Sequence, residues 1–277
     1  MKKTLDTLYK EYRIVRFFRA MQQLFQFPFF LSRTQKGTPL YDKGFDIRQA
    51  FFSPEECDRI VVDFDQAFQE RLPAPETDAY IVSRKHSAIS QFDKNVFQLM
   101  NYQGINPALK ETCEARILEA FREQLGLDLC VASYTVQLDM PDTETKRPFH
   151  VDGYGINYKL FVYLSDVKEM ADGPYTVIPA SHRHIWRKWA NLFLNLVTGN
   201  STSDDMRYLY KDGESFSVLG DKGTAILSCQ SLAHKGWQDH TGRRRYVLVV
   251  YLRAAERAGE RFVLGRELAI TEPMKLY

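Results

Sequence analysis

The sequence has few cysteines, and none of them lie close together. Only four occur among its 277 residues, with no Cys-x-x-Cys pair: Cys57, Cys113, Cys130 and Cys229. This spacing argues against a zinc knuckle and against the disulfide framework of a small secreted protein. We therefore expect a reduced, cytoplasmic protein.

Long apolar runs are also missing. The longest such stretch, AMQQLFQFPFFLS at residues 20–32, contains three glutamines and a proline. It is shorter than the ~20 apolar residues that a transmembrane helix needs. The opening residues MKKTLDTLYKEY lack the compact apolar core and small-residue cleavage site of a secretory signal. We expect neither a membrane span nor export.

A large charge of one sign is absent as well. The chain holds 37 Lys and Arg against 35 Asp and Glu, a formal net charge of +2. This balance gives no overall electrostatic case for nucleic acid, and we expect no nucleic-acid partner. Positive charge is concentrated locally, because the first 36 residues contain eight Lys or Arg and two acidic residues.

This basic N-terminal segment has helical periodicity. Its apolar residues recur at steps of three and four: Leu5, Leu8, Tyr12, Val15, Phe18, Met21 and Phe25. The spacing predicts an amphipathic helix that Pro28 ends or kinks. Two interpretations stay open. Residues 1–36 can contact an anionic membrane surface, with residues 27–31 as an apolar wedge, or the apolar stripe can pack on the rest of the protein.

After the basic segment, the predicted secondary structure changes from helices to strands. FFSPEECDRIVVDFDQAF predicts a helix with Ser53 and Glu56 as a capping box, and residues 106–125 predict another. From Cys130 onward the chain reads as short strands: VASYTVQL, INYKLFVYL, PYTVIP, ESFSVL, GTAILS and RYVLVVYL. This order predicts an α+β protein built on an antiparallel sandwich or jelly roll. We divide it into a helical appendage at 1–45 and a main domain at 46–277.

One helical stretch interrupts the predicted strands, from about His184 to Leu196. Trp186, Trp189, Phe193 and Leu196 share one face of it. Such an insert can be a lid over a pocket or an aromatic stripe packed into the core, and the sequence leaves both open.

The stretch RPFHVDGYG at residues 147–155 contains two candidate metal ligands. If it is extended, His150 and Asp152 point to the same face and can hold one metal ion. The alternative is a surface turn in which Asp152 and Gly153 bend the chain. An iron site with two imidazoles and one carboxylate would need a second histidine.

Five other histidines are available for that position: His86, His182, His184, His234 and His240. His86 precedes the β half, and His182 and His184 suit a loop or helix start. His234 follows the strand GTAILS by a short turn and precedes a strand that begins with arginines. Arg243 and Arg245 share a face of that strand, and a guanidinium suits a carboxylate of a dicarboxylate such as 2-oxoglutarate.

Three segments in order, HVDGYG, ADGPYTVIPASHR and AHKGWQDHTGRRRYVLVVYL, resemble the phytanoyl-CoA dioxygenase family of Fe(II) and 2-oxoglutarate dependent oxygenases. The helix start FFSPEECDRI is similar too, so the resemblance runs from about Asp46 to Leu252. It implies a double-stranded β-helix, that is, a cupin-like jelly roll with flanking helices. It also implies Fe(II) and 2-oxoglutarate as cofactors and O2 as co-substrate.

The resemblance carries over to individual residues. It implies that His150, Asp152 and His234 are catalytic metal ligands and that Arg245 binds 2-oxoglutarate, with Arg243 as the second candidate. The sequence departs from the family pattern at Ala180, where a glycine is usual, and at Gly236, where a small hydroxyl residue is frequent. Related halogenases have a small residue in place of the carboxylate, so Asp152 favours hydroxylation.

Gln137 is a further candidate for the co-substrate pocket. In SYTVQLD, strand parity puts Ser133, Thr135, Gln137 and Asp139 on one face. If that face lines the barrel mouth, Gln137 lies in the pocket; a solvent-facing polar row is the alternative.

The predicted activity is hydroxylation of an unactivated C–H bond in a small-molecule or lipid or glycolipid substrate. A membrane contact through residues 1–36 would favour a lipid-linked sugar, for example a lipopolysaccharide core sugar, and a location on the inner face of the membrane. Two other classes remain as alternatives. One is a jelly-roll binding module without catalysis, and the other is a zinc hydrolase that uses the same ligands.

Overall fold

In the computed structural model the described residues are 13–31, 34–69, 78–83, 95–141, 148–155, 157–198, 205–206, 208–236 and 243–255. The larger of two antiparallel sheets has the order β1-β8-β5-β10-β4-β3-β2. Its strands are β1 (Phe45–Arg48), β2 (Tyr80–Ser83), β3 (Val96–Met100), β4 (Leu129–Asp139), β5 (Asn157–Tyr163), β8 (Ala225–Cys229) and β10 (Arg245–Ala254).

The smaller sheet has the order β7-β6-β9 and carries one edge of the candidate site. Its strands are β7 (Phe216–Val218), β6 (Tyr175–Val177) and β9 (His234–Gly236). Single antiparallel bridges from His150 to His234 and to Asp205 extend it. The segment with His150 therefore lies beside β9 although the two are far apart in sequence.

The two sheets face each other across an apolar interior. One buried cluster contains Tyr163 of β5, Val249 of β10 and Ile226 of β8 together with Val177 of β6 and Val218 of β7. These residues alternate along each strand with residues of the opposite face, as the period of two requires. Two facing antiparallel sheets with this long-range strand order form a jelly roll, which confirms the predicted α+β fold class.

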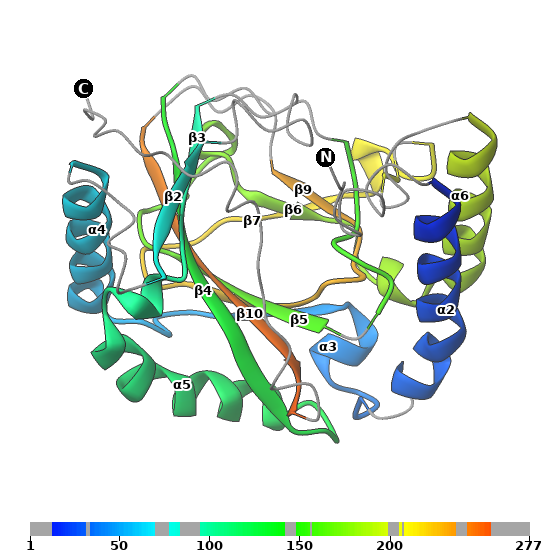
Figure 1. Ribbon diagram of the computed structural model, residues 1–277, viewed down its shortest axis with the longest axis horizontal. Coiled ribbons are helices and arrows are strands. Elements are labelled where there is room, and N and C mark those ends of the chain that lie inside the picture. Colours follow the sequence, from blue (N-terminus) through cyan, green and yellow to red (C-terminus); the bar gives the residue numbers. More distant parts are fainter. Residues whose placement is uncertain are drawn as a thin grey trace, which may run out of the picture.

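Two helices cover the outer face of the larger sheet (Figure 1). α4 (Pro54–Gln69) and α5 (Pro107–Arg122) bury Ile60, Phe64, Ile117 and Phe121 against it. The start of α4 is the predicted capping box. The backbone N–H of Glu56 donates to Ser53 Oγ at 3.2 Å, and the backbone N–H of Ser53 donates to Glu56 Oε2 at 2.7 Å.

A second pair of helices, α2 (Arg13–Leu31) and α6 (Ile185–Thr198), lies side by side at the other end of the molecule (Figure 1). Their facing sides bury Ala20, Leu24 and Leu192 in one cluster with Phe149 and Val151, which flank His150. The side of α2 that packs on the protein carries Ala20, Leu24 and Phe27, whereas Phe18 and Phe25 of the predicted apolar stripe are exposed. Of the two outcomes predicted for Pro28, an end or a kink, the first does not occur, because the helix continues to Leu31.

Short elements complete the described structure. They are α3 (Pro39–Asp42) and the 3-10 turns η2 (Tyr102–Gly104), η3 (Met170–Asp172), η4 (Ser181–Arg183) and η5 (Asp212–Glu214). None of the helices in the described ranges combines the length and apolar character that crossing a bilayer requires.

The six strands predicted after Cys130 are confirmed as β4, β5, β6, β7, β8 and β10. Four others were not predicted. β1, β2 and β3 lie in the half that reads as helical, and β9 has only three residues. These are short strands at sheet edges or near the site, and tertiary pairing rather than a local pattern forms them.

Candidate metal centre

Backbone pairing brings the two histidine segments together. The backbone N–H of His150 donates to His234 O at 3.0 Å, and that of His234 donates to His150 O at 2.9 Å. Two residues further along, the N–H of Asp152 donates to Gln230 O at 3.0 Å. The stretch around His150 is thus extended as the first interpretation required, and His150 and Asp152 lie on the same side of it.

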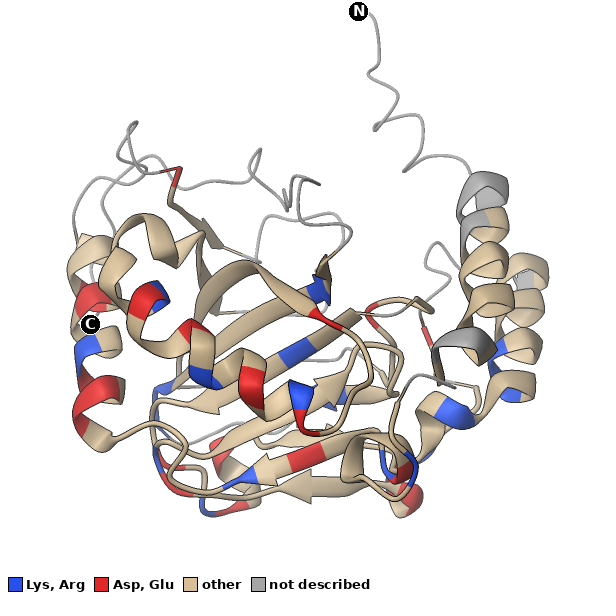
Figure 2. Cartoon of the chain, turned by 90° about the horizontal axis from the view of Figure 1, so that it is seen from below, with Lys and Arg blue, Asp and Glu red and all other residues tan. Residues whose placement is uncertain are grey.

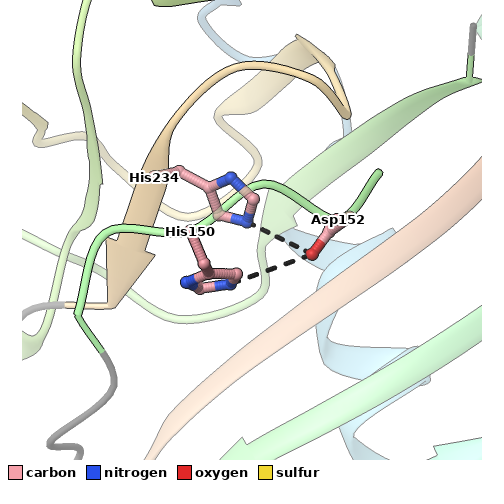
Figure 3. Close-up of side chains that lie close together, drawn as sticks. All are labelled: His150, Asp152 and His234. Atoms are coloured by element: carbon pink, nitrogen blue, oxygen red, sulfur yellow. Dashed lines mark ion pairs between the residues drawn. The ribbon is translucent and has the colours of Figure 1, made fainter. Parts of the chain in front are cut away.

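The three side chains converge on one point (Figure 3). Nε2 of His150 lies 3.8 Å from Asp152 Oδ1, and Nε2 of His234 lies 3.5 Å from the same oxygen. All three ligand atoms lie within 4.8 Å of one another. The two imidazoles are buried, whereas a quarter of the Asp152 side-chain surface is exposed, so the site is open on the carboxylate side.

Backbone carbonyls orient both imidazoles in the same way. Nδ1 of His150 lies 3.0 Å from Pro148 O, and Nδ1 of His234 lies 2.8 Å from Leu232 O. Each carbonyl can accept a hydrogen bond only from an Nδ1–H, so this contact assigns the proton to Nδ1 and leaves the lone pair on Nε2. Metal-binding histidines are held by the same arrangement in other proteins.

Lys159 is a site residue that the sequence analysis missed. Its Nζ lies 2.5 Å from Asp152 Oδ2 and 2.8 Å from His234 Nε2, and the residue is only 2% exposed. Its position in β5 explains this placement. Tyr158, Leu160 and Val162 pack toward the helices, so Lys159 and Phe161 point into the interior between the sheets.

Aromatic rings surround the Lys159 ammonium. Its Nζ lies 4.8 Å from the centre of the Phe161 ring and 5.4 Å from that of Tyr175. The Tyr175 ring in turn lies 5.3 Å from the His234 imidazole, and its hydroxyl is 3.1 Å from Ser228 Oγ. Cation–π contacts of this kind favour a charged ammonium where water is scarce.

The charges of the site are set by these contacts. Burial alone would raise the pKa of the Asp152 carboxyl, but the Lys159 ammonium and the two histidines outweigh burial and hold this pKa well below its ordinary value. Burial and Lys159 together lower the pKa of His234, although Asp152 opposes them. Asp152 is therefore a carboxylate and His234 a neutral imidazole at neutral pH, which are the forms that bind a metal.

The donor set fits a divalent transition metal. Two Nε2 atoms and one carboxylate oxygen on one side are the facial triad of non-heme iron sites, and they also suit zinc. Ligands about 2.1 Å from an ion and at right angles lie about 3 Å apart. Metal binding therefore requires small side-chain rotations that shorten the ligand separations from 3.5 and 3.8 Å. It also requires the Lys159 ammonium to withdraw from His234 Nε2, which it contacts at 2.8 Å.

The predicted co-substrate residues Arg245 and Gln137 meet at one buried carboxylate. Arg245 donates from Nε to Asp139 Oδ2 at 2.7 Å and also from Nη2, while Gln137 Nε2 donates to Asp139 Oδ1 at 2.9 Å. Gln98 Nε2 donates to Gln137 Oε1 at 2.9 Å. Gln137 thus belongs to an interior polar network rather than to a solvent-facing row. Arg243 lies before β10 and is exposed.

Two other histidines lie in the described part of the chain, and neither belongs to this cluster. His182 is buried, and its Nε2 lies 2.9 Å from Tyr41 O; Nδ1 of His184 lies 3.2 Å from the Tyr210 hydroxyl. His86 and His240 lie outside the described residues. The preference for His234 among the candidates therefore agrees with the geometry.

Ala180, where the family resemblance implies a glycine, has a backbone conformation that favours glycine. Ala180 has φ 61°, in the left-handed region, and its N–H donates to Lys43 O at 2.8 Å. The turn leads into η4, where Ser181 Oγ accepts from the N–H of Ala233, next to His234. The alanine holds a conformation that glycine adopts with less strain.

No protein-family model matches this sequence, and no curated protein matches it. Solved structures do resemble the fold. HygX from Streptomyces hygroscopicus with nickel and 2-oxoglutarate bound has 13% identity and a TM-score of 0.52 over 78% of this chain and 85% of its own. EvdO2 from Micromonospora carbonacea var. aurantiaca complexed with 2-oxoglutarate has 17% identity and a TM-score of 0.55 over 78% and 89%. The epimerase SnoN in complex with Fe3+, alpha ketoglutarate and nogalamycin RO has 15% identity and a TM-score of 0.53, over 83% of this chain and 84% of its own. These likenesses support the jelly-roll assignment.

Proposed function

We propose that this chain is an oxygenase that uses Fe(II), 2-oxoglutarate and O2 to hydroxylate a C–H bond of a small molecule. The observation that carries the proposal is the triad of His150, Asp152 and His234, with both Nε2 atoms directed at one carboxylate oxygen. This is the donor set of non-heme Fe(II) oxygenases. HygX, EvdO2 and SnoN share the fold and bind 2-oxoglutarate or alpha ketoglutarate, which supports the same chemistry here.

In this proposal the triad holds the iron, and iron with 2-oxoglutarate supplies the oxidising power when bound. The chain's own residues do the positioning. Carbonyls of Pro148 and Leu232 hold the histidines in the metal-binding tautomer. Lys159 holds Oδ2 of Asp152, so that Oδ1 remains directed at the histidines.

We assign Arg245 and Gln137 to the co-substrate. A guanidinium that enters the barrel interior from β10 can hold a carboxylate with two parallel hydrogen bonds. Asp139 orients Arg245, and Gln137 adds an amide to the same polar group. Arg245 is favoured over Arg243 because only Arg245 has its guanidinium inside the sandwich.

For the substrate, we propose a lipid or glycolipid, such as a lipid-linked sugar. HygX with hygromycin B and SnoN with nogalamycin RO bind small molecules, which supports a small-molecule substrate. The basic charge of residues 1–36 supports a membrane-held substrate and a cytoplasmic protein at the inner face of the membrane. A lipopolysaccharide core sugar is one substrate of this kind.

The test is 2-oxoglutarate turnover without any added substrate. Protein is loaded with Fe(II) under anaerobic conditions, oxygen is admitted, and succinate is measured for wild type, His150→Ala and Arg245→Ala. His184→Ala is the matched control, because His184 lies outside the triad. We expect slow turnover that both site variants lose and the control keeps.

Two outcomes would contradict the proposal. A protein that neither turns over nor binds 2-oxoglutarate in the presence of Fe(II) would be a binding module. A protein that hydrolyses esters or amides with Zn(II) and ignores 2-oxoglutarate would be a zinc hydrolase.

A further inference from the structure

Exposed apolar side chains of the described residues gather on one pair of helices. Of eleven large hydrophobic residues that are exposed, seven lie on α2 and α6: Phe18, Phe25, Trp186, Phe193, Leu194, Leu196 and Val197. Trp186 is 86% exposed, Val197 83% and Phe25 70%. Single exposed apolar residues are ordinary, but a cluster of this size on one surface marks an interaction site.

Ring contacts join aromatic side chains of this group across the two helices. Ring centres lie 5.7 Å apart for Phe18 and Phe17, and 5.4 Å apart for Phe17 and Phe193. The ring centres of Phe193 and Trp189 lie 6.3 Å apart, and those of Trp189 and Phe25 lie 5.0 Å apart. Trp186, Phe193 and Val197 also share one side of α6, at helical spacing. We call this surface the α2–α6 face.

The face has no negative charge of its own. The sequences of α2 and α6 contain no Asp or Glu. They include three arginines in α2 and Arg187 in α6, whereas Lys188 is buried on the inner side of the pair. By contrast, α4 carries five acidic residues in sixteen. Figure 2 shows the difference, since red is absent from α2 and α6 but frequent on the helices at the opposite end. Such a surface is complementary to anionic lipid headgroups.

The inner side of the helix pair contacts the rest of the protein. Asn191 and Asn195 both donate to Asp205 O, at 2.8 and 3.0 Å, and Lys188 Nζ donates to His182 O at 2.7 Å. The ammonium of Lys188 also lies 4.6 Å from the centre of the Phe27 ring. These polar contacts thus hold α6 in place in addition to the ring contacts between α2 and α6.

We propose that the α2–α6 face docks on an anionic lipid bilayer. Its aromatic and aliphatic side chains enter the interfacial region, and the positive charge that α2 and α6 carry without any acidic residue attracts the anionic headgroups. The docking is thus assigned to α2 and α6. It also means that α6 contributes a membrane surface rather than a lid.

The docking face and the metal centre belong to one packing unit. Gln23 of α2 accepts a hydrogen bond from the N–H of Tyr154 at 3.2 Å, in the loop directly after Asp152. Phe149 and Val151 pack under the same helices. The substrate class that follows is a molecule held in the bilayer, and this last step rests on the proposed function, whereas the docking does not.

The experiment measures co-sedimentation of the full chain with vesicles, in the presence of a chelator. The vesicles are phosphatidylcholine with and without phosphatidylglycerol. The variants are Trp186→Glu with Val197→Glu, and Phe25→Ser alone; Val62→Glu is the matched control, because Val62 is 62% exposed on α4 at the other end of the molecule. We expect binding to anionic vesicles only, weakened at least about tenfold in the double variant and retained in the control.

Each other outcome overturns the docking. Absence of binding to anionic vesicles does so directly. An equal loss in Val62→Glu would mean that net charge, and not this face, controls binding. A wild type that ignores vesicles and forms a dimer that the double variant abolishes would assign the face to a second copy of the chain.

Two further measurements separate a failure of the docking proposal from a failure of the proposed oxygenase function. Thermal unfolding of each variant confirms that it is folded, which is expected because the replaced side chains are mostly exposed. Succinate production without vesicles tests the oxygenase separately. The double variant should keep that turnover. If the wild type shows no turnover, the proposed oxygenase function fails, but the vesicle-binding result still tests the docking.

Discussion

The ammonium of Lys159 lies 2.5 Å from Oδ2 of Asp152, inside the jelly roll and next to the candidate ligand His234. One carboxylate thus has two tasks, since Oδ1 faces the histidines and Oδ2 accepts from a buried cation. The pair fixes the rotation of the carboxylate before any metal binds. Such a partner is expected to matter for both stability and metal binding.

Lys159→Met should lower the free energy of unfolding by about 1–3 kcal/mol at neutral pH, because Asp152 loses its charged partner in a largely buried place. Urea unfolding in the presence of a chelator measures the change. Lys222→Met is the control, since its ammonium pairs with Asp58 at 2.7 Å on the surface, where such a pair contributes under ~1 kcal/mol. Equal losses in the two variants would refute a special role for Lys159.

Asp152→Ala should weaken Mn(II) or Co(II) binding by more than about 100-fold, because it removes one of three ligands and not merely a supporting partner. Calorimetric titration of the metal gives the dissociation constants. Asp58→Ala removes an exposed carboxylate and should leave them unchanged. Metal affinity that survives Asp152→Ala would place the metal elsewhere.

Arg245→Ala should weaken 2-oxoglutarate binding about tenfold or more, whereas Arg243→Ala should have little effect. Titration of the metal-loaded protein with 2-oxoglutarate separates the two. Arg245→Ala removes the cation that pairs with Asp139, so Arg245→Lys is included to keep a positive charge beside this carboxylate. A larger effect at Arg243 would reverse the assignment.

Acid should destabilise the fold through His182. Burial, with a smaller contribution from Lys188, lowers the pKa of this histidine to about 3, whereas an unfolded histidine titrates near its ordinary value of 6.5. The unfolded state therefore binds more protons between these values, and stability falls as pH decreases. From pH 6.5 to 5 the loss is about 1.6 kcal/mol.

Urea unfolding across this pH range tests the effect. His182→Gln should flatten the acid limb of the stability profile, and His184→Gln, at a less buried position, should flatten it less. An unchanged slope in His182→Gln would show that other groups control acid sensitivity.

Ala180→Gly should raise the free energy of unfolding by about 0.5–1 kcal/mol. Alanine at φ 61° costs about 1–2 kcal/mol, and part of the gain is offset because glycine is more flexible when unfolded. The control is Ala190→Gly on the exposed side of α6, which should lower stability by about 1 kcal/mol. Destabilisation by Ala180→Gly would contradict the strained turn.

The sequence by itself determined six strands of the β half and the two candidate ligands of one segment. INYKLFVYL and RYVLVVYL are long, β-branched and aromatic, so local preference and tertiary packing agree, and both form central strands of the larger sheet. His150 and Asp152 are two residues apart, and strand parity alone places them on one side. The third ligand required the resemblance in addition, because His234 is far along the chain.

Only the tertiary structure decided the rest. Lys159 lies in an apolar strand, and strand alternation places it on the opposite face from Leu160. The local sequence does not predict that this face contacts Asp152. The same applies to Asp139, on which Arg245 and Gln137 converge from two strands. The joint face of α2 and α6 is a contact between segments more than 150 residues apart. Sequence periodicity fixes which side of an element is apolar, whereas the partner of that side is set by how the whole chain packs.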